Sequence, residues 1–224
     1  MKLRRIFLYV FLSSIILYAS VCTYMYVFQR NFLYHPDKNN YLRSEKLNAD
    51  TKEISVPSTE GIALKAWFYK NPQNKYTVLF FHGNAGGLGN RIYKLNELKN
   101  LNLNYLIISW RGFSGNKGSP TEQGLYSDAR SALKWLEKNN ISKSKIILYG
   151  ESLGTGVAVE VGQNQKFAGI ILESPYTSIV DAAKIYYPYL PVDLILKDKY
   201  LSLKKIKNIK SPILIMHGGA DIII

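Results

Sequence analysis

The sequence predicts an α/β fold, in which a mostly parallel sheet carries helices on both faces and an apolar N-terminal helix precedes it. Three observations support this prediction. Short apolar segments alternate with helical patterns along most of the chain, which favours parallel strands joined by crossover helices. A hairpin pattern opens the folded region. An uncharged run long enough to cross a bilayer lies before that hairpin.

The composition fits one folded domain with an appendage. The chain has 224 residues, of which 47% are hydrophobic, enough for a buried core. The net charge of +13 comes from scattered lysines, without zinc-finger spacing, an RNP-like aromatic pattern or a basic recognition helix. We therefore expect no nucleic-acid partner. The single cysteine, Cys22, excludes an intrachain disulfide and a thiolate metal cluster, and no cofactor or metal is expected.

The N-terminal region is typical of a membrane anchor. Residues 1–5 are basic, and residues 6–28 form an uncharged, mostly apolar run. At 1.5 Å per residue this run spans about 30 Å, the thickness of a hydrocarbon core. A cleaved signal peptide is the alternative, since residues 19–22 weakly resemble a lipoprotein cleavage box. We favour an uncleaved, single-pass signal anchor because the run is longer than that of a typical signal peptide.

Basic residues flank both ends of this run, so the orientation depends on a small difference. The positive-inside rule compares Lys2, Arg4 and Arg5 on one side with Arg30, Lys38, Arg43 and Lys46 on the other. The compact cluster at the start favours a globular domain on the non-cytoplasmic side.

Residues 29–50 are predicted to be a polar connector, and residues 51–224 the folded domain. The domain opens with a hairpin whose strands, 52–56 and 62–69, turn at Glu60-Gly61. Further strands are predicted where short apolar, β-rich segments occur: 76–81, 105–110, 145–149, 169–172 and 212–216.

Helical spacing separates these strands. Residues 86–100 and 153–162 are predicted helices. A further helix is predicted after Ser119, which has capping-box spacing, with Pro120 at the first helical position. Residues 177–210 are longer, irregular and rich in tyrosine, and we expect them to form a cap.

The pentapeptide Gly150-Glu151-Ser152-Leu153-Gly154 matches the pattern G-x-S-x-G between a predicted strand and a predicted helix. In this context the serine occupies a strained turn that lifts its hydroxyl clear of the sheet, and small residues on either side avoid clashes. The following helix directs its N-terminus towards the reacting carbonyl group. The pattern predicts that Ser152 is a nucleophile, supported by Gly150 and Gly154. A glycine-rich structural turn is the alternative.

A second glycine-rich element, His82-Gly83-Asn84-Ala85-Gly86-Gly87, directly follows a predicted strand. Glycines such as Gly83 let backbone N–H groups approach an oxyanion, and we expect the N–H groups of Asn84 and Leu153 to be its donors. His82 is expected to orient this loop by side-chain hydrogen bonds rather than to act as a base. A nucleotide loop is not expected, because no G-K-[ST] follows and the glycines do not fit G-x-G-x-x-G.

Five segments occur in the order seen in α/β-hydrolases: HGNAGG, WRGFSGNKGSPTEQGLYSDA, GESLG, LESPYTS and MHGGAD. Over residues 51–224 the chain resembles this superfamily, and within it the membrane-anchored depalmitoylase-like and Bem-type proteins. The segment FLYHP is similar to their post-anchor segment, and Ser114 stands where they often have glycine. The resemblance implies an α/β-hydrolase fold and a Ser–Asp–His triad, with Ser152 as nucleophile and Asp221 as the acid that orients the imidazole.

The resemblance also implies a catalytic histidine after one further strand. The histidines of this chain are His35, His82 and His217, and none occupies that place. We expect a C-terminally truncated or split product that lacks the last strand and helix, for which a separately encoded C-terminal fragment is a candidate partner. Glu173 is a second candidate for the acid. Without a base, the Ser152 hydroxyl is a poor nucleophile.

Three functions remain open. The first is a serine hydrolase of carboxylic esters or thioesters that works through an acyl-enzyme at Ser152 and is impaired by the absent histidine. The second is a non-catalytic remnant of the hydrolase fold or a membrane-tethered binding module. The third is an acyltransferase on the same fold. The expected substrate is a small-molecule or lipid-like acyl ester, because the tyrosines and prolines of residues 177–210 suggest an apolar acyl pocket over Ser152.

Overall fold

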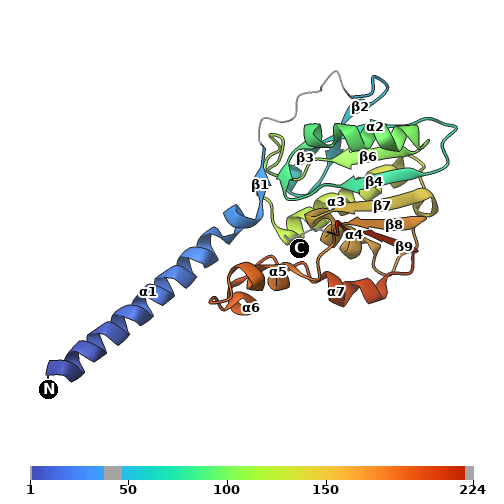
Figure 1. Ribbon diagram of the computed structural model, residues 1–224. Coiled ribbons are helices and arrows are strands. Elements are labelled where there is room, and N and C mark those ends of the chain that lie inside the picture. Colours follow the sequence, from blue (N-terminus) through green and yellow to red (C-terminus); the bar gives the residue numbers. More distant parts are fainter. Residues whose placement is uncertain (1, 38–46, 220–224) are drawn as a thin grey trace.

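The computed structural model describes residues 2–37 and 47–219, and these build a seven-stranded sheet with helices around it (Figure 1). The strands lie in the order β2 (Lys52–Pro57), β3 (Ala63–Tyr69), β6 (Asn104–Ile108), β4 (Thr77–Phe81), β7 (Ile146–Glu151), β8 (Gly169–Glu173) and β9 (Ile213–Met216). β2 and β3 form the predicted hairpin, and β3 also pairs antiparallel with β6. The other pairs of this sheet are parallel, which confirms the predicted fold class.

Helices lie on both faces of the sheet. α3 (Glu122–Lys138) and α4 (Leu153–Gly162) contribute to the core on one face, and η2 (Leu88–Arg91) with α2 (Ile92–Asn100) covers the other. Strand β4 contributes side chains to the apolar cores on both faces of the sheet. Leu79 and Phe81 join the first, while Val78 and Phe80 join the second, because side chains alternate along a strand.

Two helix starts differ from the sequence prediction. α3 begins after Thr121, whose hydroxyl accepts from the Gly124 N–H, and not after Ser119. The predicted capping box does not form because Glu122 instead accepts hydrogen bonds from the Tyr126 hydroxyl and from the backbone N–H of Lys199. The predicted helix 86–100 begins with a short strand, β5 (Ala85–Gly86), and η2, before α2. η3 (Lys143–Lys145) precedes β7, and η1 (Thr59–Gly61) forms the hairpin turn.

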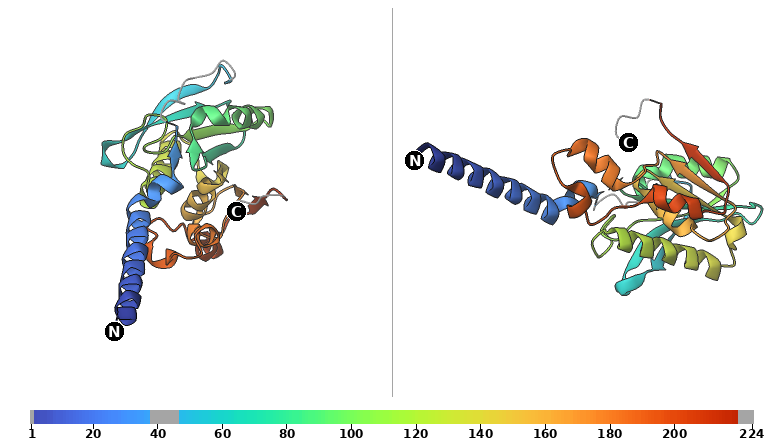
Figure 2. Two further views of the ribbon diagram at one scale, coloured as in Figure 1. Left: turned by 60° about the vertical axis from the view of Figure 1, so that its left-hand side comes forward. Right: turned by 90° about the horizontal axis from the view of Figure 1, so that it is seen from below.

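A long helix, α1 (Lys2–Leu33), projects away from the sheet domain (Figures 1 and 2). Its 32 residues span about 48 Å at 1.5 Å per residue. It therefore extends beyond both ends of the predicted run 6–28, and its last turn takes up the start of the predicted connector. Within the described ranges, α1 is the one helix long and apolar enough to cross a membrane.

The chain between β8 and β9 forms two parts. α5 (Ile179–Tyr186) and α6 (Val192–Ile195) lie together, and α6 contacts α1. α7 (Ser202–Lys205) packs against α4 and continues into η4 (Ile206–Asn208). Of the predicted cap 177–210, it is therefore the first part, α5 and α6, that lies near the end of α1. We call α5, α6 and the loop between them the cap.

Candidate active site

Ser152 lies in the tight turn between β7 and α4. Its backbone has φ 48° and ψ −117°, a conformation that strains any residue with a side chain. The turn is held from both sides. The Ser152 N–H donates to the Glu173 carbonyl oxygen at 2.9 Å, and the Ser152 carbonyl oxygen accepts from the Thr155 hydroxyl at 2.6 Å. Ser152 thus has the strained strand-to-helix geometry that G-x-S-x-G predicts.

The two glycines of the pattern are required by space. A Cβ atom on Gly154 would lie 2.0 Å from the Phe81 carbonyl oxygen. A Cβ atom on Gly150 would lie 2.5 Å from the carbonyl oxygen of Gly154. Both neighbours are backbone atoms, so neither can rotate out of the way. The glycines therefore let the end of β4, β7 and the start of α4 approach closely enough to form the turn.

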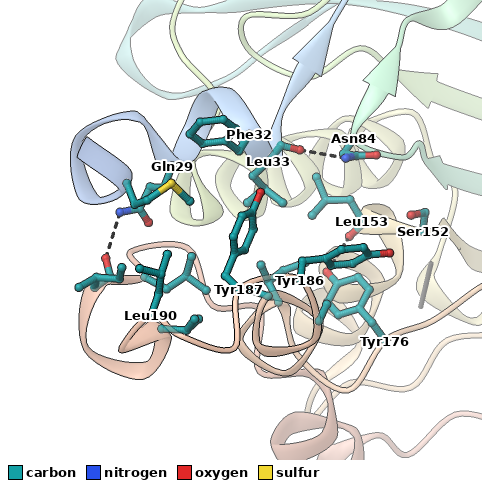
Figure 3. A pocket seen from close by; sticks show the side chains of 17 residues that line it. Gln29, Phe32, Leu33, Asn84, Ser152, Leu153, Tyr176, Tyr186, Tyr187 and Leu190 are labelled. Carbon is teal, nitrogen blue, oxygen red and sulfur yellow. Dashed lines mark hydrogen bonds between the residues drawn. The ribbon is translucent and has the colours of Figure 1, made fainter. Parts of the chain in front are cut away.

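Two backbone N–H groups beside Ser152 are available as donors. Leu153 is the first residue of α4, so its N–H has no acceptor within the helix. Among the backbone bonds of the described residues, none uses the N–H of Asn84. Asn84, Leu153 and Ser152 line one cavity and lie together at its right-hand end in Figure 3. Both residues of the predicted oxyanion hole therefore lie beside Ser152.

The loop that carries Asn84 is held by the chain that follows α1. β1 (His35–Pro36) pairs in parallel with β5. The His35 N–H donates to the Asn84 carbonyl oxygen at 2.8 Å, and the Asn84 side-chain amide donates to the Leu33 carbonyl oxygen at 2.9 Å. The predicted connector therefore builds the site as well as linking it to the helix. The similarity of FLYHP to the post-anchor segment of related proteins is the sequence signal for this role.

An apolar cavity of about 320 Å³ extends from Ser152 to α1 (Figure 3). α1 contributes Met25, Gln29, Phe32 and Leu33 to its lining, and the cap supplies much of the remainder. Tyr176 supports the floor near Ser152, where its buried hydroxyl donates to the Leu153 carbonyl oxygen at 3.1 Å. The volume and the mostly apolar lining are typical of small-molecule sites.

A second, polar hollow of about 430 Å³ also reaches Ser152. Glu151, the residue before the serine, forms ion pairs there with Arg91 at 2.5 Å and Lys94 at 2.8 Å. Burial would raise the pKa of Glu151, but Arg91 and Lys94 outweigh it and hold the pKa below its ordinary value. Glu151 is therefore ionised and paired with Arg91 and Lys94.

The structure describes one of the two candidate triad acids. Asp221 lies outside the described residues. Glu173, at the end of β8, accepts hydrogen bonds from the Lys94 ammonium and the Tyr149 hydroxyl, each at 2.5 Å. No histidine in the described ranges bonds to Glu173, so its contacts are those of an ion-pair cluster. Within those ranges, no group of three or more potential metal ligands is present.

None of the three histidines is hydrogen-bonded to Ser152 in the described structure. His82 is completely buried, and its ring centroid lies 5.4 Å from those of Trp110 and Phe113. Its Nδ1 donates to the Gly83 carbonyl oxygen at 2.9 Å, and its Nε2 has no partner. His35 pairs with Ala85, and His217 is exposed beyond β9. His82 is thus tied to the loop of Asn84 by its own side chain.

The burial of His82 predicts a pH-dependent stability. Burial lowers its pKa to about 3, from an ordinary value of 6.5. Below pH 6.5 the unfolded chain takes up a proton that the folded chain does not, so the folded state loses stability as the pH falls from 6.5 towards 3. The loss is about 1.4 kcal/mol per pH unit, or about 2 kcal/mol by pH 5.

Denaturant unfolding of the wild type and of His82→Asn at pH 7 and pH 5 measures this effect. Asparagine retains a side-chain donor but does not titrate. The drop in unfolding free energy between the two pH values should be about 2 kcal/mol smaller in the variant. The same drop in both proteins would mean that His82 is not the titrating group.

These features define the class of protein. A sequence model of the alpha/beta hydrolase fold matches residues 76–195. Protein bem46 of Schizosaccharomyces pombe is 31% identical over 216 residues, which cover 90% of this chain and 72% of that protein. The chain therefore belongs to the α/β-hydrolase superfamily, and its relatives place it in the Bem-type group that the sequence motifs predict.

Two further similarities bear on the fold and the site. The lysophosphatidylserine lipase ABHD12 of Danio rerio is 32% identical over 179 residues, which cover 70% of this chain and 47% of that protein. The crystal structure of the Pyrococcus furiosus esterase Pf2001 matches with a TM-score of 0.67 at 19% identity, covering 86% of this chain and 79% of that one. The second similarity shows the shared fold.

Proposed function

We propose that this protein is a membrane-anchored serine hydrolase that cleaves acyl esters or thioesters through an acyl-enzyme at Ser152. The observation that carries the proposal is the strained turn at Ser152, located at the end of an apolar cavity. The names of two similar proteins, the esterase Pf2001 and the lysophosphatidylserine lipase ABHD12, support the same class of reaction. Family membership alone would leave the chemistry open, because one fold hosts many functions.

In the proposed reaction, Ser152 Oγ attacks the carbonyl carbon of the ester while a general base takes the hydroxyl proton. The N–H groups of Asn84 and Leu153 donate to the oxyanion of the tetrahedral intermediate. The intermediate then expels the alcohol or thiol, which takes the proton from the base. Water hydrolyses the acyl-enzyme by the same steps and restores Ser152. An acyltransferase would differ only in this last step, where an acceptor alcohol or thiol replaces water.

No general base is hydrogen-bonded to Ser152 in the part of the chain that the structure describes. We propose that an imidazole enters the polar hollow beside Ser152 from a separately encoded C-terminal fragment, with Asp221 as its acid partner. The hollow supports this because it is polar, reaches Ser152 and is lined by Ser174 and Glu173 at the end of β8. Without that imidazole we propose an impaired enzyme, since the serine proton has no acceptor.

We further propose that α1 spans the bilayer as an uncleaved anchor, with the globular domain on the non-cytoplasmic side. Its length and its almost fully exposed apolar surface support a membrane span over a core helix. The mass of the mature protein tests cleavage, because a removed signal peptide would shorten the chain.

A fluorophosphonate probe on the intact protein in detergent tests the proposed function. We expect slow labelling at Ser152 that becomes several-fold faster when imidazole is added, because free imidazole can enter the hollow and act as the base. Ser152→Ala should remove the labelling, and Ser144→Ala, at an exposed serine of η3, should leave it unchanged. A folded protein that stays unlabelled with and without imidazole would favour the non-catalytic remnant or binding module.

A further inference from the structure

We infer that the cap is inserted in the same bilayer leaflet as the end of α1, so that the cavity opens to hydrocarbon. The substrate, an acyl ester already in the membrane, would then reach Ser152 laterally from the bilayer. The inference rests on the proposed function, because it takes α1 as the membrane span and Ser152 as the nucleophile. It adds the class of substrate and the route by which that substrate arrives.

The depth of the cap follows from one contact. The Tyr18 hydroxyl donates to the Tyr189 carbonyl oxygen at 2.8 Å. Along α1, Tyr18 lies about 15 Å before Phe28, at 1.5 Å per residue. That is half of a hydrocarbon core of about 30 Å. The span cannot shift towards the N-terminus, because Lys2, Arg4 and Arg5 limit it there. The loop that carries Tyr189 therefore lies beside the span at membrane depth.

Polar side chains near the end of α1 bind the chain at the end of the cap. The Gln29 amide nitrogen donates to the Ile195 carbonyl oxygen at 3.0 Å, and the amide oxygen accepts from the Lys197 N–H at 2.6 Å. The next residue of α1, Arg30, pairs with Asp198 at 2.8 Å. These bonds fix the end of α6 against the helix, so the position of α1 in a bilayer also sets the position of the cap.

The outer surface of the cap is unusually apolar for contact with water. Ile185, Tyr189 and Leu194 are 73%, 86% and 84% exposed. Large exposed apolar groups next to one another mark protein or membrane contacts. The bond from Tyr18 places Tyr189 beside the exposed apolar surface of α1, which points to the bilayer as the partner. Of the three charged residues of the cap, Lys184 and Asp193 pair with each other at 2.8 Å. The third, Asp181, accepts from the hydroxyl groups of Thr177 and Ser178, each at 2.7 Å.

The backbone of the cap loop is suited to hydrocarbon. Pro188 and Pro191 have no N–H group to satisfy. The N–H of Leu190 donates to the Tyr187 carbonyl oxygen, and those of Leu194 and Ile195 donate to the Pro191 carbonyl oxygen. Unpaired backbone groups are costly in lipid, and these bonds lower that cost for the loop.

The cavity connects this inserted surface to the nucleophile. Gln29 and Phe32 of α1 lie across it from Leu190 of the cap, with Ser152 at the opposite end (Figure 3). Met25 of α1 also lines the cavity. An acyl chain between α1 and the cap would place its ester at Ser152 while its tail stayed in the leaflet. The acyl chain would not need to cross water, so the reaction would avoid the free-energy cost of moving that chain out of the bilayer.

Depth-dependent quenching in phosphatidylcholine vesicles tests the insertion. The full chain, with Cys22→Ser, carries an environment-sensitive fluorophore on Leu194→Cys. Val10→Cys in α1 is the reference inside the membrane. Leu101→Cys, at a residue 67% exposed beyond the end of α2, is the reference in water. Lipids with a quencher on the acyl chain should quench position 194 nearly as strongly as position 10 and should not affect position 101. Equal quenching at 194 and 101 would overturn the inference.

Labelling of Ser152 in the same vesicles separates this inference from the proposed function. Met25→Trp should reduce labelling by a long-chain alkyl phosphonate about tenfold relative to a short-chain one, because the larger side chain narrows the route. Val27→Trp, at an exposed residue that does not line the cavity, should leave this ratio unchanged. Quenching at 194 without any labelling would support the inserted cap and contradict the hydrolase. Labelling with the same chain-length ratio in both variants would remove α1 from the acyl route.

Discussion

Gly154→Ala is expected to remove phosphonate labelling of Ser152 and to destabilise the domain by about 3 kcal/mol. The added methyl group would lie 2.0 Å from the carbonyl oxygen of Phe81 and 2.6 Å from its carbonyl carbon. β4 is hydrogen-bonded to β6 on one side and to β7 on the other, so Phe81 cannot move alone. α4 must move instead, and it carries the Leu153 N–H away from the position of the oxyanion.

Gly169→Ala is the matched control for this change. A Cβ atom on Gly169, at the start of β8, would meet only the Pro212 carbonyl oxygen at 3.8 Å, an ordinary contact. Denaturant unfolding and the rate of labelling, measured on both variants, should separate the effect of crowding from that of losing a glycine. If both variants unfold at the same denaturant concentration, the close approach of α4 to β4 does not limit stability.

The strands of this fold can be predicted from the sequence because burial leaves a local signal. All five residues of β4 are apolar or β-branched, and all are buried. The order of the strands leaves no such signal. β6 lies between β3 and β4, so the second strand of the hairpin does not pair with the next strand along the chain. That order is set by how the helices pack across the sheet, which depends on contacts distant in sequence.

Helix boundaries are predicted less well, because side chains compete for the same backbone groups. A helix starting at residue 86 would need Gly86 in helical conformation, but its φ is 76°. The Asn90 side chain accepts from the Gly87 N–H at 2.9 Å, which stabilises the turn before α2. A glycine-rich loop followed by asparagine can form either a helix start or a turn. The hydrogen bond from the Arg91 guanidinium to the Ala85 carbonyl oxygen favours the turn.

The candidate site also has a part that the sequence predicts and a part that it does not. Ser152, Gly150 and Gly154 follow from five consecutive residues, whose geometry is local. The contribution of α1 depends on residues more than 160 positions apart, such as Gln29 and Ile195. One local signal for it exists. Cys22, Met25 and Gln29 are spaced along one face of the helix, and this is the face that is partly or fully buried, unlike its neighbours. Gln29, the first residue after the apolar run, continues this face at the end of the span.

Asp128→Asn is expected to destabilise the domain by about 3–5 kcal/mol. Asp128 is completely buried in α3, where it accepts from the Ser58 hydroxyl at 2.7 Å, the Arg111 backbone N–H at 3.0 Å and the Arg111 guanidinium at 2.9 Å. Burial would lower the pKa of Arg111, but Asp128 and Glu60 outweigh it and raise the pKa. The variant would therefore leave a charged Arg111 buried without its main partner.

The matched control is Glu137→Gln in the same helix, because Glu137 pairs with Lys143 at 3.1 Å and both side chains are 39% exposed. Water can replace that partner, so we expect a change below about 1 kcal/mol. Denaturant unfolding of the two variants measures the contrast. Ser152 labelling of the folded Asp128→Asn protein should stay near the wild-type rate, since Asp128 lines neither the cavity nor the hollow at Ser152. A loss of labelling without a loss of stability would mean that Arg111 and Asp128 act on the site itself, and equal losses of stability in both variants would show that water already reaches the buried pair.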